Sequence, residues 1–327
     1  MKQKLIIGLS LVLLLTVIFL ISRDLFTNQE TNQENPTEYD LEKLKKVDSS
    51  LICYRETRHI NPSLGAVNAL ALDKNSTIYV AGDNEVQVFN KNLQKVSSIK
   101  LDSSASCIAV SGDKLYAGIG NHVEVYNLNG TKLKRWNAYS PKAYITSIAV
   151  NETGVYIADA GVRLVYRCSA EGNLLTLIGK KDKSRGIDGF IIPSLYFDLA
   201  IAPDNELWVV NPGKHEITNF NEKGDFRTSW GVPSMQSNGF AGCCNPVQFC
   251  FLPDGKFVTC EKGLDRIKIH DQSGKFECYV AILSGTNTQA LSYSSTGARI
   301  HDVAADTDGT IYVLDAVSKL VRIFEKK

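Results

Sequence analysis

A seven-residue phrase that occurs six times constrains the fold of this chain more than any other feature. Each copy follows a turn residue, carries an aromatic side chain near its start and ends in small or polar residues. A unit of this size cannot bury its apolar face alone, so the recurrence indicates one supersecondary unit packed against its own copies. The copies are TIYVAGD (77 to 83), KLYAGIG (114 to 120), GVYIADA (154 to 160), ELWVVNP (206 to 212), KFVTCEK (256 to 262) and TIYVLDA (310 to 316).

The segments around each phrase complete a four-stranded unit. A short apolar run such as AVNALAL (66 to 72) precedes the phrase and is typical of a buried strand. A segment of alternating apolar and polar residues, such as DRIKIHD (265 to 271), follows it and indicates a strand with one face on a core. Turns such as Asn129-Gly130 then lead to a fourth strand. Six repeats of four antiparallel strands predict an all-β fold, a six-bladed β-propeller.

The two ends of the chain support the count of six. The sixth repeat stops at Lys327 after its third strand, so its outer strand is missing. Residues 51 to 60 (LICYRETRHI) precede the first repeat and have the length and β-rich composition to supply that strand. A β-solenoid or an open all-β array also repeats, but it predicts shorter and more uniform units and does not explain the missing and surplus strands.

The repeats resemble the NHL-repeat family of propellers. GVYIADAGVRLVYRCSAEG (154 to 172) keeps the family pattern best. KFVTCEKGLDRIKIHDQSG (256 to 274) keeps the Arg and the closing turn but has Cys260-Glu261 in place of Ala-Asp, and GIDGFIIPS (186 to 194) is similar to the family's Gly-Phe-Pro linker. The resemblance covers residues 51 to 327 and implies a propeller. Such propellers include protein-binding and RNA-binding modules, extracytoplasmic sensors and a few lyases, so the resemblance does not choose a function.

The first 50 residues predict a membrane anchor and a tether. Lys2 and Lys4 precede an uncharged stretch from Leu5 to Ile21, which as a helix spans roughly 25 Å. A signal anchor or transmembrane helix over 1 to 23 fits better than a cleaved signal peptide, because no Ala-x-Ala site is present. Residues 24 to 50 are polar and predict a linker. The propeller is then expected on the extracytoplasmic side, periplasmic or extracellular.

Charge and cysteine content narrow the classes of partner. The chain has 36 basic and 35 acidic residues, which argues against a nucleic-acid partner, since such proteins carry a basic footprint. Export permits disulfides among the eight cysteines. Cys53, Cys107 and Cys168 fall at different strand positions, so we expect them to be buried free thiols.

Three long insertions are expected on one face of the propeller. They are residues 179 to 195, 231 to 246 and 283 to 299, each joining one blade to the next. Because strand direction reverses three times in a blade, these loops emerge on the same face as the turns between second and third strands. Loops on a rigid scaffold are where binding residues concentrate, so this face is the candidate ligand-binding face.

The densest chemistry on that face is a group of cysteines. Cys243 and Cys244 lie in the loop that enters the fifth blade, and Cys260 leaves the second strand of that blade. Three outcomes stay open: a disulfide from Cys243 or Cys244 to Cys260, a metal or redox site, and unpaired thiols. His301 and Asp302 are a candidate neighbouring ligand and its orienting carboxylate.

Polar residues are also expected along the channel at the propeller axis. The starts of the inner strands place Asn68, Ser106, Thr146, Gln248 and His301 there. The second-strand exits Asp83, Asp159, Glu261 and Asp315 predict an acidic rim that holds a cation or a basic ligand, or that only caps turns. His122, His215 and His270 lie on third strands and are expected at the surface. The residues assigned to the ligand-binding face are Asp159, Asp198, Gln248, Glu261, Lys262, His301, Asp302 and Asp315.

No motif for a serine hydrolase, a phosphate loop or a dinucleotide site is present. The leading hypothesis is a membrane-tethered, extracytoplasmic NHL-like propeller that binds a protein, a peptide or a glycan. The alternative is a metal-binding or redox protein, or a lyase-type enzyme, that uses Cys243, Cys244, Cys260 and His301. A purely structural spacer is the third class.

Overall fold

The computed structural model describes residues 8, 14–17, 19, 44–283 and 298–327. The chain divides into two units, Met1–Asp40 and Leu41–Lys327. The predicted anchor (1 to 23) and linker (24 to 50) lie mostly outside the described residues, as does most of the insertion from 283 to 299. No helix within the described ranges is long and apolar enough to cross a membrane.

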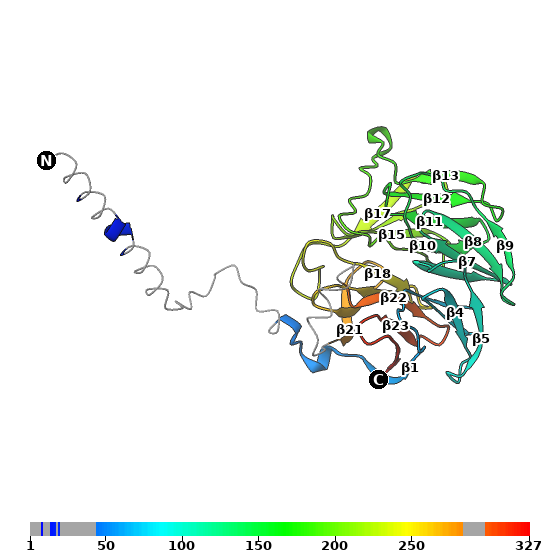
Figure 1. Cartoon of the computed structure of the whole chain (residues 1–327), viewed down its shortest axis with the longest axis horizontal. Helices are drawn as coiled ribbons and strands as arrows, with labels where there is room; N and C mark the ends of the chain where they lie inside the picture. Colours follow the sequence, from blue (N-terminus) through cyan, green and yellow to red (C-terminus); the bar gives the residue numbers. More distant parts are fainter. Residues whose placement is uncertain (1–7, 9–13, 18, 20–43, 284–297) are drawn as a thin grey trace. The chain divides into compact units, whose positions relative to one another are not determined.

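Leu41–Lys327 forms six four-stranded antiparallel sheets, which confirms the predicted six-bladed β-propeller (Figure 1). The inner strands are β2 (Ala69–Leu72), β6 (Cys107–Ser111), β10 (Ile145–Asn151), β14 (Leu199–Ile201), β18 (Gln248–Phe251) and β22 (Ile300–Ala305). The second strands, which contain the repeated phrase, are β3 (Ile78–Gly82), β7 (Lys114–Ile119), β11 (Gly154–Asp159), β15 (Leu207–Asn211), β19 (Phe257–Cys260) and β23 (Ile311–Asp315).

The third and fourth strands form the outer half of each blade. The third strands are β4 (Glu85–Phe89), β8 (His122–Asn127), β12 (Leu164–Cys168), β16 (Glu216–Phe220), β20 (Arg266–His270) and β24 (Leu320–Lys326). The outer strands are β5 (Lys95–Lys100), β9 (Lys132–Arg135), β13 (Leu174–Ile178), β17 (Phe226–Trp230), β21 (Phe276–Ile282) and β1 (Tyr54–Ile60). Two short 3-10 helices, η1 (Ser49–Leu51) and η2 (Lys183–Arg185), lie in connecting segments.

The sixth blade contains both ends of the propeller. Strand β1, from the segment predicted to close the ring, pairs antiparallel with β24, and Tyr54 lies opposite Lys326. A disulfide joins Cys53 to Cys278 on β21, the outer strand of the fifth blade. The prediction of a free thiol at Cys53 is therefore wrong, whereas Cys107 and Cys168 are buried and free as expected.

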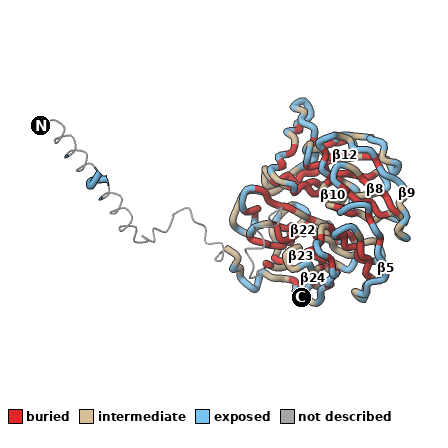
Figure 2. The backbone as a smooth tube through the Cα atoms, in the orientation of Figure 1, coloured by how far each residue is buried: buried red, intermediate tan, exposed pale blue. Residues whose placement is uncertain are grey.

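The core lies between neighbouring blades. Ile78 and Val80 of the first blade pack in one cluster with Leu314 and Ile323 of the sixth, so apolar contacts complete the ring as well as hydrogen bonds. Burial is greatest in the middle of a blade: the second strand β3 is buried at every position, whereas the outer strand β9 has no buried residue and the inner strand β18 has one (Figure 2). Radial packing of the blades produces this pattern, because the outer strands meet the surrounding water and the inner strands line the central channel.

Aromatic residues pack against the turns of the next blade. Gly172 has φ +87°, and a Cβ there would lie 2.5 Å from Cδ2 of Trp136 in the preceding blade. The Gly of this turn is therefore needed both for its left-handed backbone and for the close approach of the indole ring.

Candidate functional site

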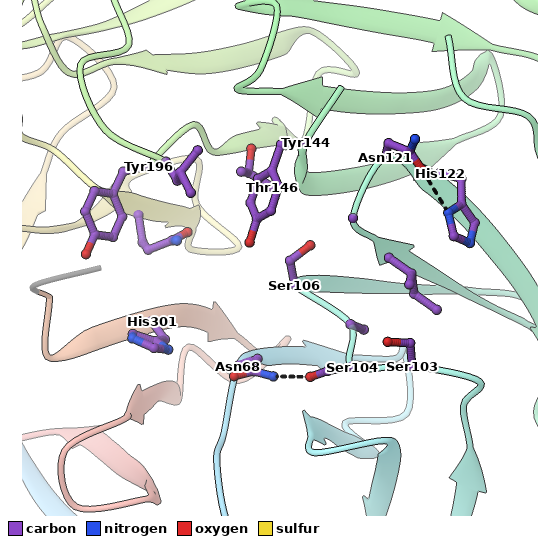
Figure 3. Close-up of a pocket in the computed structure, with 15 residues that line it drawn as sticks. Asn68, Ser103, Ser104, Ser106, Asn121, His122, Tyr144, Thr146, Tyr196 and His301 are labelled. Carbon is purple, nitrogen blue, oxygen red and sulfur yellow. Dashed lines mark hydrogen bonds between the residues drawn. The ribbon is translucent and has the colours of Figure 1, made fainter. Parts of the chain in front are cut away.

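The principal cavity opens at the mouth of the central channel and has a volume of about 660 Å³. Figure 3 shows its polar side chains arranged around the open space, with Asn68, Ser106, Thr146 and His301 on four different blades. All five residues predicted to line the channel are in its wall, which confirms that prediction. The lining residues are Asn68, Ser103, Ser104, Ala105, Ser106, Ile119, Gly120, Asn121, His122, Tyr144, Thr146, Leu195, Tyr196, Gln248 and His301.

Below this mouth the channel continues as a second cavity of about 330 Å³. Residues from the inner strands of all six blades line it, among them Asp198 and Asp302. Ser106, Thr146, Gln248 and His301 line both cavities, so the mouth and the channel are continuous.

Several polar groups in the mouth also join adjacent blades. The Ser106 hydroxyl donates to the carbonyl oxygen of Ile145 in the next blade at 2.5 Å. Thr146 donates in the same way to the carbonyl of Phe197 at 2.7 Å, and Nδ1 of His301 lies 3.2 Å from the carbonyl oxygen of Val67. A strand-start position thus has two roles, since the same side chain lines the cavity and fixes one blade to the next.

Gln248 and Tyr144 remain available to a ligand. Within the described part of the chain, no protein hydrogen bond engages the side-chain amide of Gln248 or the hydroxyl of Tyr144, whereas both residues line the cavity. A polar group that lines a cavity without a protein partner can exchange its water for a ligand at little cost. These two side chains are the best placed to select a ligand.

Asp198 and Asp302 occupy equivalent positions on their inner strands and connect blades through backbone donors. Oδ2 of Asp198 accepts the N–H of Phe249 at 2.9 Å, and Oδ2 of Asp302 accepts that of Leu70 at 2.8 Å. Burial raises the pKa of Asp198 to about 6. Burial, with a smaller contribution from the charge of Asp198, raises the pKa of Asp302 to about 8. These carboxyl groups lie inside the channel and not on an exposed face.

The predicted acidic rim is wrong at three of its four positions, because Asp159, Glu261 and Asp315 are fully buried. Asp159 accepts the backbone N–H of Tyr144 at 2.9 Å and the hydroxyl of Tyr166 at 3.0 Å, so it holds the loop from the second blade to the third. Because Asp159 is buried, its carboxylate is the acceptor that these two donors need. The sequence alone shows only that Asp159 lies at the end of a strand.

Asp315 makes the equivalent connection in the sixth blade with ionic partners. Its Oδ2 atom lies 2.9 Å from the guanidinium of Arg299 and 2.8 Å from that of Arg322. Asp83, by contrast, is exposed and accepts the N–H groups of Gly65 and Ala66. The acidic residues at the ends of the second strands therefore cap turns and loops, as the alternative prediction had it, and do not form a ligand-binding rim.

Glu261 pairs with Lys268 on the neighbouring third strand at 3.2 Å, and both side chains are fully buried. Glu261 also accepts the N–H of Ala241 at 2.6 Å, while Lys268 donates to the carbonyl of Gly239 at 2.6 Å. The two charges therefore hold the insertion 231 to 246 against the fifth blade.

The surface location expected for the third-strand histidines is wrong in two cases. His270 is fully buried beside this insertion, and burial lowers its pKa to about 3. His122 lines the cavity, with Nδ1 3.2 Å from Oδ1 of Asn121 and Nε2 3.5 Å from the buried Glu124 (Figure 3). His215 is partly exposed and contacts the carbonyl of Gly242.

Of the three outcomes left open for the cysteine group, the disulfide from Cys243 or Cys244 to Cys260 does not form. Cys260 is a buried free thiol, whereas the sulfur atoms of Cys243 and Cys244 lie 2.9 Å from each other. The backbone still pairs as expected, because the N–H of Val247 donates to the carbonyl of Cys260. Among the described residues, no group of three or more His, Cys, Asp or Glu side chains could hold a metal ion.

Lys262 connects this loop to the cavity wall. Its ammonium group lies 4.9 Å from the ring centroid of Tyr196, a cavity residue on the segment that follows the insertion 179 to 195. Tyr144, Tyr196, Ser103 and Ser104 line the cavity and were not predicted. The sequence offers only one way to find these residues, which is their position: each lies in a connection between two blades, just before an inner strand.

Comparison with known proteins supports the fold. No protein-family model and no curated protein matches the chain. The streptogramin B lyase structure matches with a TM-score of 0.60 at 10% identity, covering 86% of this chain and 100% of that one. A protein of unknown function from Bacteroides thetaiotaomicron has a TM-score of 0.61 at 14% identity (84% and 76% covered). The WD40 β-propeller domain of Doa1 has a TM-score of 0.55 at 14% identity (80% and 79%). At these identities the matches show the propeller fold alone.

Proposed function

We propose that this protein is an NHL-like propeller that binds an uncharged polar ligand, either a glycan or a peptide segment of a protein, in the cavity at the channel mouth. The composition of the cavity wall carries this proposal. Among its described lining residues none is Asp, Glu, Lys or Arg, whereas hydroxyl, amide and aromatic groups converge on it from several blades. Such a wall suits hydrogen bonding to a neutral ligand, and propellers are general scaffolds for protein interaction.

The N-terminal sequence and one disulfide support an extracytoplasmic, membrane-tethered location. The Cys53–Cys278 bond belongs in an oxidising compartment, and the uncharged stretch from Leu5 to Ile21 follows a basic start. We expect the full chain to stay with membranes in alkaline carbonate and to be released by detergent. Release by carbonate alone would contradict the tether.

A lyase-type activity is the second candidate. Streptogramin B lyase and virginiamycin B lyase share the fold, and His122 and His301 line the cavity of this chain. Nδ1 of each histidine is held, by Asn121 and by the Val67 carbonyl, which orients the rings and is compatible with either binding or catalysis. The metal-dependent form of the alternative gains no support from the described residues.

The purified full-length chain can be tested on printed arrays of neutral glycans and of short peptides, with heparin fragments as a charged comparison. We expect retention of members of one neutral class and recovery of the bound compound unchanged by mass spectrometry. Binding restricted to heparin would contradict the proposed ligand chemistry. Recovery of a cleaved or eliminated product would favour the lyase.

A further inference from the structure

The two adjacent cysteines of the insertion 231 to 246 form a pair that the proposed ligand site does not use. The sulfur atoms of Cys243 and Cys244 are 2.9 Å apart, which is closer than two unbonded sulfur atoms normally approach. Cys243 is exposed and Cys244 is buried. One sulfur therefore meets solvent while the other lies protected directly behind it.

The backbone on both sides of the pair is fixed. Ala241 donates its N–H to Glu261 at 2.6 Å, and the Asn245 side chain donates to the Ala241 carbonyl at 2.6 Å. Asn245 also accepts the N–H of Lys262 at 2.8 Å. The close contact between the sulfurs is thus held by bonds on either side of the pair.

The charge around the pair favours a thiolate. Burial tends to raise the pKa of Cys244, but hydrogen bonds from Cys243 and Lys262, with the charge of Lys262, outweigh burial and lower that pKa. The hydrogen bond to Cys244 raises the pKa of Cys243. Burial raises the pKa of Cys107, Cys250 and Cys260. A thiolate, not a thiol, is the attacking species in disulfide exchange, so the buried Cys244 thiolate serves first as the base that takes the proton of the exposed Cys243.

We propose that Cys243 and Cys244 form a reversible thiol–disulfide exchange site, with Cys243 as the attacking residue and Cys244 as the resolving residue, and a low-molecular-weight disulfide as the oxidant. The two residues are joined by a trans peptide bond, which places their Cα atoms about 3.8 Å apart. Ordinary disulfides span about 4.4 to 6.8 Å between Cα atoms, so a bond between neighbours is strained. Strained, exposed disulfides are easily reduced, so we expect this bond to form reversibly and not to act as a permanent structural cross-link.

The exchange takes place in two steps. The proton of Cys243 passes to Cys244, and the Cys243 thiolate attacks one sulfur of the oxidant, so that a mixed disulfide forms and one thiolate leaves. Cys244 then gives its proton to water and attacks Sγ of Cys243, which forms the bond between the neighbours and expels the second thiolate. The protein loses two electrons and the one proton that the pair shares, and one small disulfide becomes two thiolates, one of which takes up the released proton.

Oxidised glutathione provides the test on the full-length chain. After acid quenching, chymotrypsin cleavage behind Phe240 and Phe249 releases residues 241 to 249 for mass spectrometry. In the wild type we expect this peptide to lose the mass of two hydrogens and to regain it in excess reduced glutathione. Cys250 and Cys260 serve as internal controls and are expected to remain free.

Two variants assign the roles of the cysteines. Cys244→Ser should retain a glutathione adduct on Cys243, since no resolving thiol remains, whereas Cys243→Ser should gain no adduct in the same time. An intact Cys53–Cys278 peptide and an unchanged circular dichroism spectrum verify the fold of both. Free thiols at both positions in oxidised wild type, or a lasting adduct on wild-type Cys243, would overturn the proposal.

Discussion

Lys268 and His270 show how a long insertion changes the environment of single residues. Alternation along the third strand predicts a solvent-facing His270, yet both side chains are fully buried. The insertion 231 to 246 covers this face, with the Phe240 ring 4.7 Å from the Lys268 ammonium. Strand periodicity reports which side of a sheet a residue occupies, but it contains no information on where a distant loop will pack.

Asp302 makes the stability of the propeller depend on pH. Its pKa is raised to about 8 by burial and by Asp198, against about 3.9 in an unfolded chain, so the folded state holds the proton more tightly. The free energy of unfolding therefore falls as the pH rises from the unfolded toward the folded pKa. Burial lowers the pKa of His301 and of His270, so the unfolded chain holds their protons more tightly than the folded state does, and these two residues oppose part of the decrease.

We therefore expect the free energy of unfolding to fall by about 1 kcal/mol between pH 6.5 and 8, and Asp302→Asn to abolish most of this decrease. Urea denaturation at a series of pH values measures it. Asp308→Asn, at an exposed residue of the same blade, is the matched control and should keep the wild-type slope. An Asp302→Asn variant with the wild-type slope would assign the effect to another group.

At the scale of elements, strand β1 was predictable and its disulfide was not. The repeat itself shows one strand missing at one end and one in excess at the other, which is sufficient to pair β1 with β24. The Cys53–Cys278 bond depends on the neighbouring blade, where the N–H of Cys53 donates to the carbonyl of Tyr279 at 3.0 Å. Cysteine positions alone do not specify which blades meet at this seam.

This disulfide closes a loop of 225 residues in sequence separation and secures the strand that completes the ring. Because a cross-link over a long loop restricts the unfolded chain, we expect the double variant Cys53→Ser, Cys278→Ser to lose about 2 to 5 kcal/mol of unfolding free energy. Chemical denaturation measures the loss, and wild type treated with reductant should approach the variant. Equal denaturation midpoints for wild type and variant would show that β-pairing alone holds β1.

At the scale of the whole molecule, the repeat determines both the fold and the position of the cavity. Six inner strands begin at equivalent points around one axis, so Asn68, Ser106, Thr146, Gln248 and His301 could be assigned to the channel from their place in the repeat. The second role of Ser106, Thr146 and His301 as links between blades depends on the distance from one blade to the next. The same limit explains why Asp159 and Asp315 were expected at a rim but are buried caps.

The cavity at the channel mouth is the central claim, and Gln248 tests it most directly. Isothermal titration of a neutral glycan or peptide retained on the arrays should give about tenfold weaker binding for Gln248→Leu, the loss of roughly one ligand hydrogen bond. Gln94→Leu, an exposed glutamine in the turn between β4 and β5, is the matched control and should bind as the wild type does. Equal affinities for wild type and Gln248→Leu would contradict the account and place the ligand elsewhere on the propeller.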